Sequence, residues 1–213
     1  MNDVGFYGKL ASRGDFVSRG LPNTFIQPWD QWLAAGIQAS QQSLGERWLE
    51  AYLVSPLWRF ALAPGVCGPD AVVGVMMPSI DRVGRYFPLT VAQVLGACES
   101  LASAVVGADE WFEGVEEALL ATLEPDAAFE RFEAALQPYC GASPLPRGAS
   151  GHLLAATTPE QRAQALAECA CAGMSLWWGR GSERIAPGLL RCAGLPRSDD
   201  FGGFLLGSEA QFG

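Results

Sequence analysis

The sequence is poor in the residues from which most enzyme active sites are built. Its 213 residues include one histidine, His152, and six cysteines without a CxxC pair. A serine–histidine or cysteine–histidine nucleophile would have to use His152, yet no GxSxG segment is present. Zinc sites need several histidine or cysteine ligands at short spacing. We therefore expect a binding protein without catalytic residues, metal or cofactor.

Basic charge and long hydrophobic runs are also scarce. Fourteen lysines and arginines face 23 aspartates and glutamates, which gives a net charge of −9. Nucleic acids and anionic membranes attract basic clusters, so neither is an expected partner. No apolar run of about 18 residues occurs, and the N-terminus lacks the basic and apolar regions of a secretory signal. We expect a cytoplasmic protein whose cysteines remain thiols.

The apolar residues that are present predict an ordered fold of mixed class. They make up 49% of the chain, whereas charged residues make up 17%, so a large core is expected. Apolar spacing predicts strands at 5–10 and 16–19, helices from about 23 and at 46–53, strands at 58–63, 71–77 and 89–95, and helices at 109–123 and after 125. Pro28 is expected in the first turn of the first regular helix. This order indicates an α+β fold, an antiparallel meander of about five strands packed between helices, similar to profilin-like and longin-like proteins.

The region after residue 137 is expected to form an extension of this platform. Residues 138–150 are rich in proline, glycine and serine and predict a loop. Thr158, Pro159 and Gln161 match a helix start with a capping box. Strands are expected at 174–178 and 189–192, and a short helix near 199–206. We expect a platform of residues 1–137 and a mainly helical extension of residues 138–213 packed on it, and the sequence leaves open whether the extension is a separate lobe.

Two segments combine glycine, arginine and aspartate between expected strands. The first is Gly5–Phe16, and the second is Pro78–Thr90. In one interpretation the aspartates pair with the arginines and fix the shape of each loop, because a guanidinium binds a carboxylate through two hydrogen bonds. In the other, the arginines and Tyr86 present a binding surface, since arginine and tyrosine are frequent at interface hot spots. The candidate partner-binding residues are Arg13, Asp15, Asp81, Arg82, Arg85 and Tyr86, followed by Trp177 and Trp178.

The two tryptophans are weaker candidates than the loop residues. Neighbouring residues of a strand face opposite sides, so one of Trp177 and Trp178 is expected in the core. The glycine clusters match neither GxxxxGK[ST] nor GxGxxG, so no phosphate-binding loop is predicted from them.

Both segments resemble the signatures of the TagF family, whose members are encoded with bacterial type VI secretion systems. The resemblance also includes Trp29-Asp30 with Trp32-Leu33, Ser175-Leu-Trp-Trp178, and Gly194-Leu-Pro196. It implies a post-translational negative regulator whose partner is the forkhead-associated scaffold protein Fha. Some relatives carry a fused phosphatase domain, and this chain looks like the stand-alone form. The family supplies no catalytic residues to carry over.

Two other functions remain open from the residues alone. Arginine-lined glycine turns can hold phosphates, so a small-molecule or nucleotide sensor is the main alternative. A hydrolase that uses His152 is a third possibility.

Overall fold

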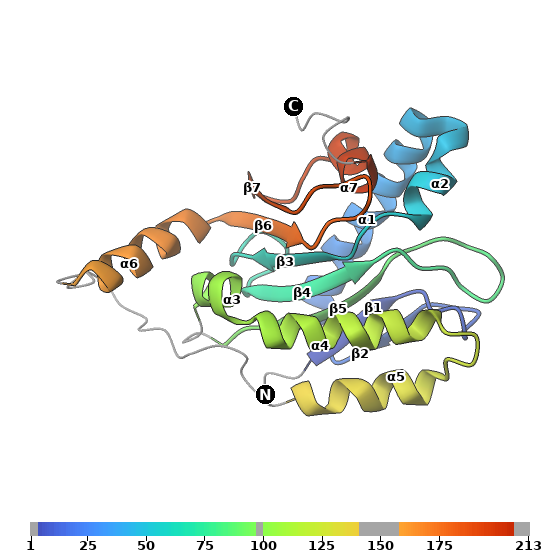
Figure 1. Cartoon of the computed structure of the whole chain (residues 1–213), viewed down its shortest axis with the longest axis horizontal. Helices are drawn as coiled ribbons and strands as arrows, with labels where there is room; N and C mark the ends of the chain where they lie inside the picture. Colours follow the sequence, from blue (N-terminus) through green and yellow to red (C-terminus); the bar gives the residue numbers. More distant parts are fainter. Residues whose placement is uncertain (1–3, 97–99, 141–157, 207–213) are drawn as a thin grey trace.

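The computed structural model describes residues 4–96, 100–140 and 158–206 of the chain (Figure 1). Seven strands form one antiparallel sheet in the order β2-β1-β5-β4-β3-β6-β7. The strands are β1 (Val4–Gly8), β2 (Val17–Arg19), β3 (Trp58–Leu62), β4 (Val72–Met77), β5 (Leu89–Val94), β6 (Met174–Gly179) and β7 (Gly188–Ala193).

Helices cover both faces of the sheet. They are α1 (Asn23–Leu44), α2 (Trp48–Leu53), α3 (Leu101–Gly107), α4 (Asp109–Leu120), α5 (Phe129–Leu136), α6 (Pro159–Cys171) and α7 (Gly202–Leu206). Short 3₁₀ turns are η1 (Gly45–Arg47), η2 (Ala121–Leu123), η3 (Gln137–Tyr139) and η4 (Ser198–Phe201). No helix in the described ranges is both long and apolar enough to span a bilayer.

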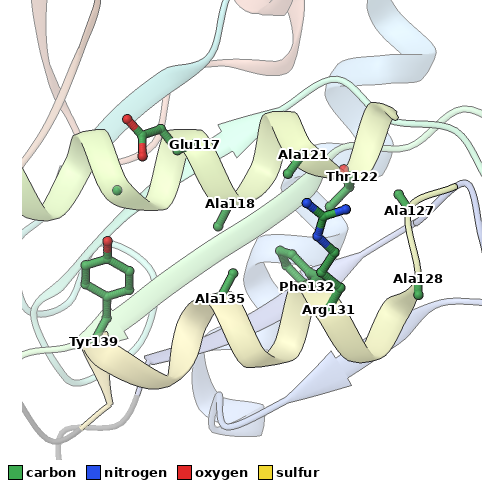
Figure 2. Close-up of a pocket in the computed structure, with 11 residues that line it drawn as sticks. Glu117, Ala118, Ala121, Thr122, Ala127, Ala128, Arg131, Phe132, Ala135 and Tyr139 are labelled. Carbon is green, nitrogen blue, oxygen red and sulfur yellow. The ribbon is translucent and has the colours of Figure 1, made fainter. Parts of the chain in front are cut away.

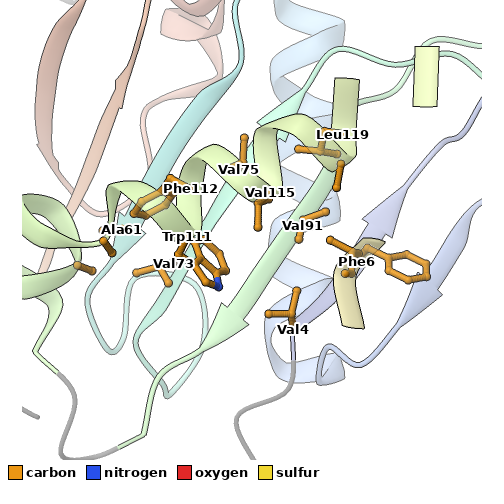
Figure 3. Close-up of a cluster of buried hydrophobic side chains, with 14 of the residues drawn as sticks. Val4, Phe6, Ala61, Val73, Val75, Val91, Trp111, Phe112, Val115 and Leu119 are labelled. Atoms are coloured by element: carbon orange, nitrogen blue, oxygen red, sulfur yellow. The ribbon is translucent and has the colours of Figure 1, made fainter. Parts of the chain in front are cut away.

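The central strands are buried on both faces because successive side chains of a strand point to opposite sides. Val73, Val75 and Val91 pack against α4, whose Trp111, Phe112, Val115 and Leu119 point at the sheet (Figure 3). The residues that alternate with them along the strands, Val72, Met76 and Ala92, face the core under α1, α2 and α7. This double burial explains why all six residues of β4 are buried and apolar or glycine.

The core under α1 is built from aromatic rings. Trp29 and Trp177 are fully buried and stack with their ring centroids 5.9 Å apart. The Trp29 indole N–H donates to Thr90 Oγ1 at 3.0 Å, and that of Trp32 donates to the carbonyl of Pro196 at 2.7 Å. Buried indoles need such acceptors, and these bonds join α1 to the sheet and to the chain after β7.

The expected α+β class is confirmed, but the sheet has seven strands where about five were expected, because the strands expected at 174–178 and 189–192 join it. β6 pairs with the free edge of β3, and β7 pairs with β6, so the sheet continues through the C-terminal residues. The described residues after 157 are more helical than extended, with α6, η4 and α7 beside the two strands. Leu176 and Trp177 of β6 are buried, one in each core. The capping box is confirmed, since Thr158 Oγ1 accepts from the Gln161 N–H and the Gln161 side chain accepts from the Thr158 N–H.

Two helices differ from the expectations. The first begins at Asn23, as expected, but it keeps Pro28 in its interior, so the expected place of Pro28 in the first turn is wrong. The Thr24 carbonyl has no N–H to accept at Pro28, and it lies so close to Gly68 that a Cβ there would be 2.7 Å from its oxygen. The second, α3, was not expected, although Ser100 caps it through a bond from the Ser103 N–H.

A buried ion pair ties the sheet to α4. Arg59 of β3 donates from Nε and Nη2 to the two carboxylate oxygens of Glu116, at 2.6 and 2.9 Å. Its Nη1 donates to Asp109 at 2.7 Å. Arg59 is 5% exposed and Glu116 7%, so removing either partner leaves a charge in the interior.

We predict that Arg59→Met lowers the free energy of unfolding by roughly 3 kcal/mol, because Glu116 is left buried without its main counter-charge. Urea denaturation measures this change. Arg59→Met combined with Glu116→Leu should lose less than the single variant, since no buried charge remains. Arg197→Met at an exposed position is the control, with an expected change of about 0.5 kcal/mol or less. Equal losses for the single and double variants would contradict the argument.

Candidate functional site

The two glycine–arginine–aspartate segments form loops that lie against each other at one end of the sheet. We call them the β1–β2 loop (residues 9–16) and the β4–β5 loop (residues 78–88). Ser79 Oγ donates to the carbonyl of Lys9 at 2.8 Å, and the Arg82 N–H donates to the carbonyl of Arg13 at 2.9 Å. The adjacency follows from the sheet, in which β1 pairs with β5 and β5 pairs with β4.

A buried carboxylate at Asp81 holds both loops. Its Oδ2 accepts from Lys9 Nζ at 2.9 Å and from Arg85 Nε at 2.6 Å. Its Oδ1 accepts from the backbone N–H groups of Val83 and Arg85 at 3.0 and 2.9 Å. Asp81 is 3% exposed and Lys9 is 6% exposed. One side chain thus fixes the β4–β5 turn and joins it to the β1–β2 loop.

The electrostatics of this site favour the ionised carboxylate. Burial alone would raise the pKa of Asp81, but the hydrogen bonds from Lys9 and Arg85 outweigh it and hold the pKa well below its ordinary range. The Arg85 guanidinium also donates to the Gly14 carbonyl and lies 3.5 Å from Asp15. Arg85 therefore bridges the two loops while its side chain stays 55% exposed.

The tip of the β4–β5 loop projects into solvent. The Gly84 N–H donates to the Asp81 carbonyl at 3.0 Å, and Gly84 adopts a φ of 87°, a conformation that other residues rarely take. Arg82 and Val83 occupy the exposed positions of this turn, and Val83 is 64% exposed. Among the described residues, no carboxylate pairs with the Arg82 side chain.

The base of the β4–β5 loop is anchored on α2. The Tyr52 hydroxyl donates to the Ser79 carbonyl at 2.9 Å and accepts from the Ser79 N–H at 3.0 Å. Tyr86 is half-buried and meets the rings of Trp48 and Tyr52 edge-on, with centroids 5.7 and 5.6 Å away. The exposed tip is therefore carried on a rigid base.

Phe16, the last residue of the β1–β2 loop, adds an exposed aromatic ring. It is 46% exposed and stacks on Tyr7, with centroids 5.5 Å apart. Lys9 Nζ lies 5.2 Å from the Phe16 centroid. Beneath the ring, the Tyr7 hydroxyl donates to Asp30 Oδ1 at 2.6 Å, and burial together with this bond raises the pKa of Tyr7 above its ordinary value.

Arg13 faces away from this tip, toward α5. Its guanidinium lies over the Phe129 ring at 4.5 Å and donates to Glu130 at 3.0 Å. Asp15 is fully exposed at its side chain. The interpretation in which aspartates pair with arginines to fix the loops therefore holds for Asp81 and Arg85. Arg13 pairs instead with Glu130 of α5.

The two tryptophan candidates belong to the packing of β6. Trp177 is fully buried, and its indole N–H donates to Ser175 Oγ at 2.9 Å, so it offers no surface to a partner. Trp178 is half-buried and meets Phe112 of α4 edge-on at 5.0 Å. His152 lies outside the described residues.

Sequence reasoning missed three residues of this site: Lys9, Phe16 and Val83. Lys9 is the only lysine of the chain and lies within the segment Gly5–Phe16, so its position could have marked it as a candidate site residue. Nothing in the local pattern marked Val83 as exposed, because its exposure depends on the turn that Asp81 and Gly84 form. No group of three or more possible metal ligands occurs within the described ranges.

A separate hollow of about 280 Å³ lies between α4 and α5 (Figure 2). Its lining is mostly small, with alanines 118, 121, 127, 128 and 135 around the Phe132 ring. Glu117 and Arg131 are its charged members and come from opposite helices. We assign no chemistry to this hollow, and the hydroxyl of Thr122 in its lining donates to the Leu119 carbonyl at 2.6 Å.

We predict that Asp81→Asn lowers the thermal midpoint of unfolding at neutral pH, because Lys9 stays buried without its counter-charge. A carboxyl whose folded pKa is depressed contributes stability above its unfolded pKa and loses it as the pH falls toward the folded value. The difference between wild type and variant should thus shrink below about pH 4. Circular-dichroism melts between about pH 3 and 7 measure it. Asp15→Asn is the exposed control, and a difference independent of pH would refute the assignment.

Comparison with known proteins identifies the family. Residues 5–139 match the family model described as TagF N-terminal domain, type VI secretion system-associated. A crystal structure of PA0076 from Pseudomonas aeruginosa PAO1 is similar over 96% of this chain and 94% of that chain, with 60% sequence identity and a TM-score of 0.90. A search of curated proteins returned no match. The matched region contains both loops and the Asp81 site, and the chain belongs to the TagF family of type VI secretion system-associated proteins.

Proposed function

We propose that this protein is a non-catalytic negative regulator of a bacterial type VI secretion system. In this proposal it binds a cytosolic component of the system, the forkhead-associated scaffold protein Fha, through the tip of the β4–β5 loop and its surroundings. The observation that carries the proposal is an exposed Arg82–Val83 tip held by the buried Asp81 carboxylate. Family membership supports the type VI context.

The chemistry of the tip suits a protein partner. An exposed arginine beside an exposed aliphatic side chain combines charge with apolar area, and arginine is enriched among hot-spot residues. Phe16 adds an exposed ring on the neighbouring loop. Because Asp81 fixes the turn before binding, little conformational entropy would be lost on association.

Charge complementarity indicates what such a partner presents. The two loops carry Lys9, Arg13, Arg82 and Arg85 against Asp15 and Asp81, a net charge of 4 − 2 = +2 in a chain of −9. A local basic surface on an acidic protein favours an acidic partner surface and disfavours other orientations. Arg82 is the member of this set best placed to pair outward, because Arg85 is bonded to Asp81 and Arg13 to Glu130.

We predict that Arg82→Glu combined with Val83→Asp weakens binding to purified Fha at least tenfold, or about 1.4 kcal/mol, because both tip side chains are changed. Isothermal titration calorimetry measures the dissociation constant. The same variant should release repression of type VI secretion in cells that carry it as the only copy.

The matched control is Arg162→Glu combined with Leu166→Asp on α6, which makes the same chemical changes at exposed positions away from the loops. Thermal melts check that both variants fold. Arg85 is left intact in this design, since its substitution would also disturb Asp81. Wild-type affinity in a folded tip variant would rule out the tip as the contact.

The sensor alternative receives less support from the loops. A phosphate would have to compete with Asp81 for Arg85 and with Glu130 for Arg13, which leaves Arg82 at the tip. A nucleotide at one hundred times its dissociation constant would add about 2.7 kcal/mol of stability. We predict no shift of the thermal midpoint across a nucleotide panel, and a shift lost in Arg82→Glu would favour the sensor instead.

A further inference from the structure

The strand β7 forms one open edge of the seven-stranded sheet. It pairs with β6 alone, from Met174↔Ala193 to Gly179↔Gly188. In an antiparallel pair, alternate residues turn their backbone N–H and C=O groups away from the neighbour. Half of the six residues of β7 therefore direct these groups outward, and no described element lies beyond β7 in the sheet (Figure 1).

The opposite edge is protected, whereas no strand, helix or turn of the described ranges pairs with the outer side of β7. Proteins shield sheet edges with short strands, charges, proline or a covering element. β2 has three residues, and its Arg19 pairs with Glu133 of α5. β7 is twice as long and carries one charged residue, Arg191, whose Nε donates to the Ala170 carbonyl at the end of α6 at 2.7 Å.

The side chains of β7 extend an apolar surface to this edge. Leu189 lies opposite Trp178 in the register, on the face that α4 covers. Phe112 of α4 packs on Trp178, but Leu189 remains 60% exposed. On the same face, Arg191 has no carboxylate partner among the described residues. Within the part of the chain that the structure describes, the edge therefore combines outward-facing backbone groups, an exposed apolar side chain and an arginine without a carboxylate partner.

We propose that β7 accepts an extended segment of another protein as an eighth, antiparallel strand. Backbone hydrogen bonds give such an added strand its affinity, and side chains opposite alternate residues give specificity. An apolar side chain would pack on Leu189, and an acidic side chain two residues away would pair with Arg191, because residues two apart share a face.

Charge favours an acidic segment over a second copy of this chain. In the β6–β7 hairpin and the residues that follow it, Arg180, Arg184 and Arg197 pair with Glu113, Glu50 and Asp199. Arg191 of β7 is left without a carboxylate among the described residues, so an acidic side chain complements this edge, whereas a second β7 would bring another arginine to it. This site lies at the sheet edge opposite β2, so the inference is independent of the proposed loop contact.

The probe is a capped synthetic peptide of about nine residues, with alternating valine and threonine and one central glutamate. We expect it to slow hydrogen exchange of backbone amides in β7 of the full chain. The same peptide with lysine in place of glutamate should bind about fivefold more weakly, as cross-strand charge pairs predict. A version N-methylated at alternate residues should not bind, because it cannot form the ladder.

Arg191→Glu should reverse the preference between the glutamate and lysine peptides. Arg191→Gln removes the charge but keeps a donor for the Ala170 carbonyl, so it should abolish the preference between the two peptides. This second variant serves as the test if Arg191→Glu fails to fold. The proposal is overturned if peptide up to about 1 mM leaves exchange in β7 unchanged. It is also overturned if β7 is protected without peptide and the chain is dimeric by ultracentrifugation, since a second copy would then cover the edge.

Discussion

The arrangement of the candidate site depends on the buried carboxylate of Asp81. A buried charge is costly unless hydrogen bonds and counter-charges surround it, and here two cationic side chains and two backbone amides do so. Lys9 comes from the β1–β2 loop and Arg85 from the β4–β5 loop, so the same interaction that satisfies the charge also fixes the distance between the loops. Replacing the three groups by apolar residues could retain stability but would remove this directional constraint.

The sheet makes that interaction possible. β1 pairs with β5, which brings Gly8 opposite Leu89, the first residue of β5, and against the preceding Pro88. A Cβ at Gly8 would lie 2.1 Å from the Pro88 carbonyl oxygen, and Gly8 has a φ of 141°, so glycine is required at this close approach. Lys9 follows directly, and its side chain reaches Asp81. Gly8 of the first segment therefore places Lys9 where it can pair with Asp81 of the second segment, 72 positions further along the chain.

Local chemistry explains what the sequence could predict. The capping box at Thr158, the burial of one residue of the Trp177–Trp178 pair, and the pairing of Asp81 with Arg85 four residues on all depend on short spacings. Partners distant in sequence were not predictable. No local pattern indicates that β6 joins the edge of β3, or that Arg13 finds Glu130 on α5. Pro28 was misplaced for the same reason, because the nearby Gly68 comes from a distant turn.

The division of roles among the loop arginines favours a protein partner over a small anion. Arg85 has its Nε on Asp81 and its terminal nitrogen on the Gly14 carbonyl, so its charge is committed to loop structure. Arg13 is committed to α5 through Glu130 and the Phe129 ring. Anion sites instead need several donors that converge on one point. A single outward arginine beside the exposed Val83 offers apolar area and one charge, which agrees with the proposed protein contact better than with a bound anion.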